Sequence, residues 1–268
     1  MRKLIDFSLI LKAETVRDFI FMKRYPAETI SFLFFMYLIL LAILFGFHQL
    51  AGSASGVLNK DKMILGYSLM QFVMATQMGW SGQIQNESQT GTLEQLSISG
   101  HTLGEVLLAR GLSQMPRQML SFYVLLGAYT FSIENISLSL SPHIPQTILL
   151  LLIMGIGIFG LSYIFAGITL IFKRVGFFFQ IINFAFLGLF WQDRTKLADG
   201  GAIAFIYDHF PLTLGMANLQ KLLTGTSGPA FTDYLSFTVH SIAFCIAGYM
   251  IFLWMEGRAR DGGLLSQY

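Results

Sequence analysis

Long uncharged apolar runs constrain the fold of this chain more than any other feature of its sequence. A helix needs about 20 mainly apolar residues to cross the hydrocarbon core of a bilayer. Six segments approach or exceed that length, and we expect a membrane-spanning helix from each: 30–47, 63–82, 119–133, 144–172, 175–192 and 235–255. The third is the shortest, and it extends back to Leu112 if Arg117 reaches toward the head groups. The predicted fold class is therefore an all-α integral membrane protein with six transmembrane helices.

The overall composition supports a membrane protein and argues against a large soluble domain. Hydrophobic residues make up 54% of the 268 residues and charged residues 12%, against roughly 25% charged residues in soluble domains. We expect one membrane domain over 1–268, with the spans in 30–255. The net charge of +2 is too small to indicate a nucleic-acid partner. The single cysteine, Cys245, excludes a disulfide within the chain.

The first 28 residues combine an apolar stripe with scattered charges. Leu9, Ala13, Val16 and Ile20 recur at helical spacing, and Pro26 ends the pattern before the first apolar run. We expect a cytoplasmic helix over 1–28 that lies on the membrane surface. The alternative is an ordinary amphipathic core helix.

The positions of Lys and Arg predict the orientation, because cytoplasmic loops carry more of them. With the N-terminus inside, twelve of the 17 lie on the inner side and five on the outer side. The inner residues are Arg2, Lys3, Lys12, Arg17, Lys23, Arg24, Arg110, Arg117, Lys173, Arg174, Arg258 and Arg260, and the outer ones are Lys60, Lys62, Arg194, Lys196 and Lys221. Both termini, including the tail 256–268, should therefore be cytoplasmic.

Motifs for catalysis and metal binding are missing from the sequence. There is no G-x-x-x-x-G-K-[ST] phosphate loop, and the five histidines are dispersed without metal-ligand spacing. We therefore expect no catalytic residues, no metal site and no cofactor in this chain. No span carries a central ionisable residue, which argues against an ion-coupled carrier.

Polar and small residues inside the apolar runs have two interpretations. Gln71, Gln77, Gln180 and Asn183 either line a transport pathway or form hydrogen bonds between helices. Gly157, Gly160 and Gly167 share one face of a helix, which is typical of close helix packing.

A polar interruption, 86–99, separates the second and third runs. Thr92 is a candidate N-cap, and Leu93 and Leu96 give a short helix one apolar edge beside Glu94. This pattern suits docking into a groove on a partner, or an ordinary cytoplasmic loop with one helical turn.

A second short apolar segment, 210–225, precedes the last run. It is too short to cross a bilayer, and it has Pro211 near its start and Gly225 at its end, which are helix start and stop signals. We expect a short helix that is re-entrant or lies on the outer surface. A folded external loop is the competing interpretation.

One string gives the chain a family resemblance. Glu87-x-x-x-Gly91-Thr92-Leu93-Glu94-x-Leu96, followed by Leu107-Leu108-Ala109-Arg110, resembles the permease subunits of ABC-2 type transporters. The resemblance implies that the residues of this string contact a separate ATPase: Glu87, Gly91, Thr92, Leu93, Glu94 and Leu96. It also implies a second permease chain, identical or different, with ATP and Mg on the ATPase subunits. More loosely, Phe210, Pro211 and Leu214 resemble the segment that closes the outer mouth of the pathway.

The resulting prediction is a permease subunit of an ATP-driven exporter, in contact with membrane lipids and set in a bacterial cytoplasmic membrane. It is not an enzyme itself. The main alternative is a membrane scaffold or binding subunit without a transport cycle, and an ion-coupled secondary carrier is the third.

Overall fold

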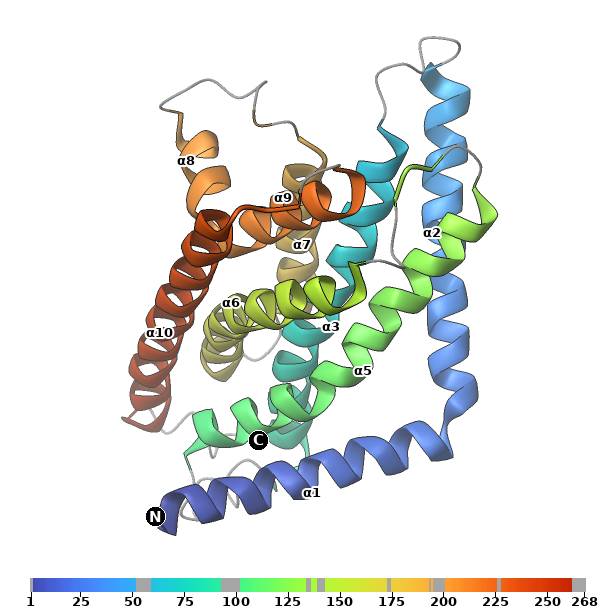
Figure 1. Cartoon of the computed structure of the whole chain (residues 1–268). Coiled ribbons are helices and arrows are strands. Elements are labelled where there is room, and N and C mark those ends of the chain that lie inside the picture. Colours follow the sequence, from blue (N-terminus) through green and yellow to red (C-terminus); the bar gives the residue numbers. More distant parts are fainter. Residues whose placement is uncertain are drawn as a thin grey trace.

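A computed structural model describes residues 2–51, 59–92, 102–133, 136–138, 143–172, 175–192, 194, 201–225 and 228–261. Within these ranges every regular element is a helix, which confirms the all-α prediction (Figure 1). The helices are α1 (Arg2–Arg24), α2 (Pro26–Ala51), α3 (Lys60–Gln89), α5 (Leu103–Ser132), α6 (Ile144–Phe172), α7 (Gly176–Trp191), α8 (Ala202–His209), α9 (Pro211–Thr224) and α10 (Phe231–Asp261).

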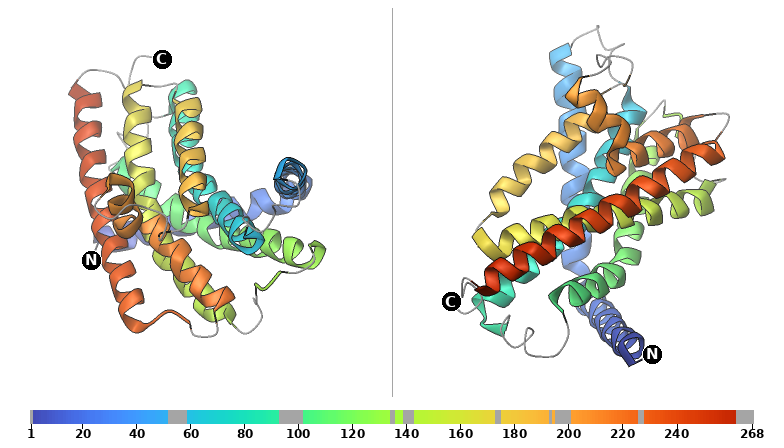
Figure 2. Two further views of the ribbon diagram at one scale, coloured as in Figure 1. Left: turned by 90° about the horizontal axis from the view of Figure 1, so that it is seen from above. Right: turned by 90° about the vertical axis from the view of Figure 1, so that its left-hand side faces the viewer.

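Most of the helices form one bundle, while α1 and α2 lie at its margin. Figure 1 shows α1 lying across the lower end of the bundle, and α2 standing upright at the side. Seen from above, α2 is separated from the other upright helices (Figure 2). The lower end, with α1, holds the end of α3 and the beginning of α5, whereas α8 and α9 lie near the upper end (Figure 1). This arrangement places the end of α3, with residues 90–92 that follow it, at the same end as α1.

Three helices in the described part of the chain are long and apolar enough to cross a membrane: α2 over Pro26–Gly46, α6 over Ile144–Phe172 and α10 over Phe231–Asp261. The structure therefore supports a membrane protein. A helix also forms in each of the other three predicted spans, but α3 and α5 are more polar. Helix α7 has 16 residues, so at about 1.5 Å per residue it is shorter than a bilayer core of about 30 Å. The six-span topology thus stays a prediction.

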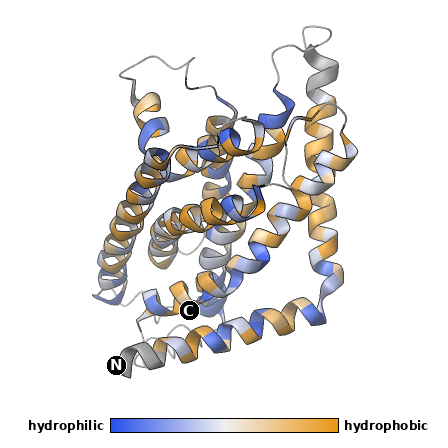
Figure 3. Cartoon of the chain, in the orientation of Figure 1, coloured by the Kyte–Doolittle hydropathy of each residue, from blue (hydrophilic) through white to orange (hydrophobic). Residues whose placement is uncertain are grey.

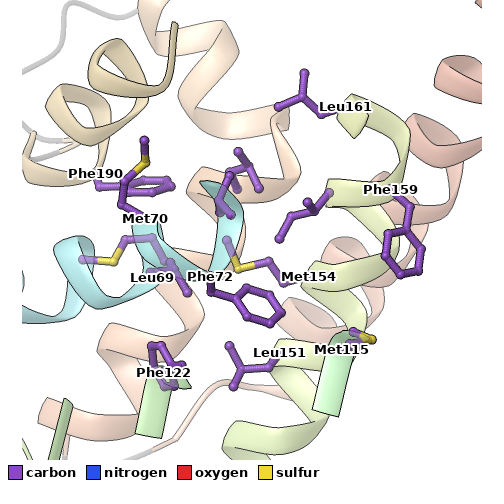
Figure 4. Close-up of a cluster of buried hydrophobic side chains, with 14 of the residues drawn as sticks. Leu69, Met70, Phe72, Met115, Phe122, Leu151, Met154, Phe159, Leu161 and Phe190 are labelled. Carbon is purple, nitrogen blue, oxygen red and sulfur yellow. The ribbon is translucent and has the colours of Figure 1, made fainter. Parts of the chain in front are cut away.

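The core surrounds α6, which is apolar on all sides. In the apolar window of α6, 72% of the residues are buried, compared with 22% for α10 and 6% for α2. Side chains of α3, α5, α6 and α7 meet in one hydrophobic cluster that includes Phe72, Phe122, Met154 and Phe190 (Figure 4). Deep burial identifies α6 as the central helix, and slight burial identifies α2 as a peripheral one.

Two glycines of the α6 stripe, Gly160 and Gly167, face α10, and the third, Gly157, lies against Pro211 at the start of α9. A Cβ atom added at Gly160 would lie 2.5 Å from the carbonyl oxygen of Phe244, and one added at Gly248 would overlap the carbonyl oxygen of Gly160. A Cβ at Gly167 would lie 2.6 Å from the sulfur of Met255. The prediction of close helix packing on this stripe is confirmed, because only glycine lets the two backbones approach this closely.

The outer surface of the bundle is strongly apolar. Hydrophobic residues run along α2 and α10 over most of their length (Figure 3). Phe34 of α2 is 59% exposed and Met250 of α10 is 64% exposed. An apolar surface of this extent is typical of contact with lipid or with another protein.

Helix α1 exposes the apolar stripe recognised in the sequence. Leu9 is 59% exposed, Val16 50% and Ile20 54%. Glu14 and Asp18 lie one turn apart on another face and are half-buried against the bundle. Exposure of the stripe fits a helix lying on a membrane surface, and that location remains a prediction.

Candidate functional site

The end of α3 carries the first residues of the predicted ATPase contact. Glu87 lies in the last turn of the helix, and Gly91 follows with φ +71°, in the left-handed region that favours glycine. The backbone N–H of Gly91 donates to the carbonyl of Ser88 at 3.3 Å. Gly91 therefore adopts a conformation that does not continue the helix.

Thr92 is tied back to the same turn. Its hydroxyl donates to the carbonyl of Glu87 at 3.3 Å and lies 2.9 Å from the hydroxyl of Thr90. The remaining predicted contact residues, Leu93, Glu94 and Leu96, lie outside the described residues. The N-cap role of Thr92 therefore stays a prediction.

Arg110 of α5 connects Glu87 to the rest of the lower end. It is 5% exposed, and its Nη2 lies 2.5 Å from Oε1 of Glu87. Its Nε donates to Oε1 of Glu14 on α1 at 3.0 Å. The guanidinium thus binds two carboxylates that are far apart in the sequence. We call Glu14, Glu87 and Arg110 the Arg110 triad.

Two carboxylates favour the charged form of Arg110 although its side chain is buried. Burial acts to lower the pKa of Arg110, but the hydrogen bonds and negative charges of Glu87 and Glu14 outweigh it and raise that pKa above its ordinary value. Arg17 adds a further positive charge, with its Nη2 2.6 Å from Oε2 of Glu14. The four residues together carry no net charge, which lowers the cost of placing them away from water.

The start of α5 is held in place by its own sequence. The hydroxyl of Thr102 accepts from the N–H of Glu105 at 3.2 Å, and the Glu105 carboxylate accepts from the N–H of Thr102 at 3.3 Å. This capping box satisfies backbone groups that a helix N-terminus leaves unpaired. It begins the helix two turns before Arg110 and thereby sets the direction in which Arg110 enters the triad.

A second ion pair fixes α1 further along α5. Nε of Arg117 donates to Oδ2 of Asp18 at 3.2 Å. Asp18 follows Glu14 by one helical turn, and Arg117 follows Arg110 by two, so both pairs lie along the same helix contact. Helix α1 is therefore attached to α5 at two points, and to α3 through Arg110.

The four predicted pathway residues occupy different environments. Gln71 lines a cavity between α1, α2, α3 and α5, whereas Gln180 is exposed on α7. Gln77 and Asn183 are fully buried, and within the described part of the chain neither side-chain amide has a hydrogen-bond partner. Their role in a pathway stays a prediction, and so does the competing role in helix-to-helix hydrogen bonding.

The segment before α10 forms the short helix expected from the sequence. Helix α9 begins with Pro211 and ends at Thr224, with Gly225 as its C-cap. Pro211 is buried against Gly157 of α6, and the ring of Phe210 lies 5.2 Å from the rings of Phe186 and Phe244.

Helix α9 is accordingly part of the packed bundle and not only a surface loop. Leu214, the third predicted gate residue, is half-buried against the core. A gating or re-entrant role for these residues is still a prediction.

Sequence reasoning missed Glu14 and noted Asp18 only as a charge beside the apolar stripe. It used Arg110 and Arg117 for the orientation, Arg110 also in the family string and Arg117 also at the start of the third span, and assigned none of them an ion pair. A usable signal was present in the spacing. Two carboxylates lie one turn apart on α1, and two arginines lie two turns apart on one side of α5, so each helix offers charges opposite to those of the other. In the described residues no group of three or more His, Cys, Asp or Glu side chains is arranged to hold a metal ion.

Comparisons with protein-family models, with curated proteins and with solved structures found no match to this chain. Its function is therefore inferred from its own residues and geometry.

Proposed function

We propose that this chain is the permease subunit of an ATP-driven exporter of the ABC-2 type, which forms the translocation pathway as a dimer. A separate ATPase, which binds ATP and Mg, couples to it through residues 87–98. The observation that carries the proposal is the Arg110 triad. It joins Glu87, where this segment begins, to the peripheral helix α1 and to α5.

The triad supplies a route for mechanical coupling. A partner that displaces the segment after α3 displaces Glu87 with it, because Gly91 and Thr92 hold the turn close to the helix end. The planar guanidinium of Arg110 binds both carboxylates with directional hydrogen bonds. Movement at the end of α3 therefore reaches α1 and α5 together, as a transition between inward-open and outward-open packings requires.

Residues 87–98, which we call the coupling segment, have different roles in this proposal. Leu93 and Leu96 provide the apolar anchor for the ATPase, and Glu94 makes a polar contact with it. Glu87 acts in the other direction, toward Arg110. At the opposite end of the bundle, Phe210, Pro211 and Leu214 close the outer mouth.

The exposed apolar surfaces support a second permease and surrounding lipid. Helix α2 contains the first predicted span, and only 6% of the residues in its apolar window are buried within the chain. In the proposed dimer its surface is shared between lipid and the partner permease. Both termini and the Arg110 triad then lie on the cytoplasmic side.

Replacement of the apolar anchor tests the coupling role. The double variant Leu93→Glu and Leu96→Glu should remain in the membrane, fail to retain an ATPase of the phosphate-loop type on purification in mild detergent, and lose nucleotide-dependent conformational change. Gln89→Glu is the matched control, because it adds a negative charge at an exposed position in the last turn of α3. Unchanged ATPase retention in the double variant would overturn the proposal.

The same purification separates the alternatives. A scaffold subunit need not retain an ATPase, and a secondary carrier would move cargo down an ion gradient in vesicles without ATP. For this exporter we expect ATPase retention and no gradient-driven transport.

A further inference from the structure

A cavity of about 300 Å³ lies between α1, α2, α3 and α5, away from the Arg110 triad. It opens where α1 turns into α2, since Phe21, Glu28 and Phe32 line it and are exposed. The volume is at the lower end of the range for small-molecule sites, which is roughly 300–1,000 Å³. The cavity can therefore hold one compact group with an extension to the outside.

The lining combines two opposite charges with aromatic walls. Arg117 contributes a guanidinium and Glu28 a carboxylate, and Gln118 and Ser121 add further polar atoms. Phe72 closes the inner wall from α3. A ligand that carries both a negative and a positive group beside an apolar part matches this lining.

The two charges are available to a ligand to different degrees. The Nε of Arg117 is held by Asp18, which leaves the terminal nitrogens of the guanidinium as donors for an anion. Glu28 lies in the first turn of α2 and has neither an ion pair nor a hydrogen bond in the described part of the chain. It can pair with a cationic group without breaking a native contact, and exposed phenylalanine rings beside it favour an ammonium further.

The position of the cavity identifies the source of the ligand. Helix α2 is long and apolar enough to cross a membrane from Pro26 onward. Its first turn, with Glu28, therefore lies at the level of the lipid head groups. The apolar surface of α2 continues from the opening of the cavity through exposed residues such as Phe34 and Phe35, along which acyl chains can lie.

We infer that this cavity binds the head group of a zwitterionic glycerophospholipid of the phosphatidylethanolamine type. The phosphate is bound by Arg117, with Gln118 and Ser121 beside it, and the ammonium is bound by Glu28. The acyl chains follow α2 into the bilayer. The inference depends on membrane residence and on these residues, and it does not require that the chain be an exporter.

Native mass spectrometry of the delipidated full chain in detergent tests the inference with two added lipids, phosphatidylethanolamine and phosphatidylglycerol. The wild type should bind phosphatidylethanolamine about tenfold more tightly, the ratio expected from one charge-assisted contact. Glu28→Gln should bring the ratio close to one, because it removes the partner of the ammonium. Arg117→Gln should weaken the binding of both lipids by about tenfold, because both carry a phosphate.

Two further variants separate binding from structure. Asp18→Asn removes the same contact between α1 and α5 as Arg117→Gln but keeps the guanidinium, so lipid binding should be retained. Arg258→Gln removes an exposed cation on α10, outside the cavity, and should change neither affinity. Loss of binding in Asp18→Asn equal to that in Arg117→Gln would overturn the inference.

Soluble competitors distinguish a lipid site from a site for free anions. Glycerophosphoethanolamine, which has the head group without acyl chains, should displace the lipid only at high concentration, and inorganic phosphate should not displace it. Displacement by inorganic phosphate alone, or an unchanged lipid preference in Glu28→Gln, would refute the proposed lipid site.

Discussion

Nη2 of Arg110, near the beginning of α5, lies 2.5 Å from Oε1 of Glu87, in the last turn of α3. The Arg110 side chain is 6% exposed and that of Glu87 18%. The same guanidinium binds Glu14 of α1. One arginine therefore joins three helices at the end of the bundle from which the predicted ATPase contact begins.

Glu87→Gln should weaken this junction without removing its polar atoms. The variant leaves Arg110 with one carboxylate, and a hydrogen bond to a charged group contributes about 1.5–3 kcal/mol. We expect a loss of stability in that range, seen as a lower thermal unfolding temperature in detergent, together with weaker coupling to the ATPase. Asp261→Asn is the control, because Asp261 is an exposed carboxylate at the end of α10 without an ion pair in the described part of the chain, and it should leave the unfolding temperature unchanged. Equal effects of the two variants would contradict the role of the triad.

The two ion pairs that attach α1 to α5 should differ in strength. A double-mutant cycle on Asp18 and Arg117 should give a coupling energy of about 0.5–1 kcal/mol, because the Arg117 side chain is 30% exposed and such pairs are partly screened by solvent. A cycle on Glu14 and Arg110 should give a larger value. The measurement is chemical unfolding in detergent at two salt concentrations. If salt weakened the pair of Glu14 and Arg110 more than the pair of Asp18 and Arg117, the assigned difference in burial would be wrong.

Gly160→Ala should separate α6 from α10. The added Cβ would lie 2.5 Å from the carbonyl oxygen of Phe244, which belongs to the backbone and cannot rotate away. Overpacking of this kind costs about 1–3 kcal/mol. Thermal unfolding should show the loss, and Gly257→Ala, where an added Cβ meets nothing within 4 Å, should be neutral or stabilising. A neutral Gly160→Ala would show that the two helices have room to move apart.

Gly91→Val should disturb the turn that leads into the coupling segment. A β-branched residue at φ +71° is strained, at a cost of roughly 1–2 kcal/mol, whereas asparagine tolerates this region better. Gly91→Val should therefore reduce ATPase retention while Gly91→Asn keeps most of it. Hydrogen exchange at the last turn of α3 would report the fraying directly. Loss of retention in both variants to the same degree would indicate that side-chain size, and not backbone conformation, matters there.

Cysteine labelling checks the orientation of the whole bundle. In a Cys245→Ser background, a cysteine at Gln95 should react with a membrane-impermeant maleimide only after the membrane is opened. A cysteine at Lys60, at the beginning of α3, should react from outside intact cells. The opposite pattern would invert the topology and remove the ATPase contact from the cytoplasm.

The sequence predicted the helices well because its signals there are local. Apolar runs gave the positions of α2, α6 and α10, and Pro211 and Gly225 bracketed α9. The glycine stripe of α6 correctly predicted a close helix contact, since residue size and helical spacing are properties of one segment. The partner of that stripe, α10, is not specified by either property.

The length and composition of the apolar runs were therefore enough to predict a helix in each of the six, and three of these helices are long and apolar enough to cross a membrane. Only the tertiary structure decided which charges meet. Glu14 and Arg110 are separated in the chain by α2, by α3 and by parts of α1 and α5. An ion pair between them depends on how α1 lies against α5 and on which faces the two helices turn toward each other. The sequence contains both charges, but their contact follows from packing that buries α6 and leaves α1 at the margin. For the same reason the cavity beside Glu28 and Arg117 became visible only when α1, α2, α3 and α5 were placed together.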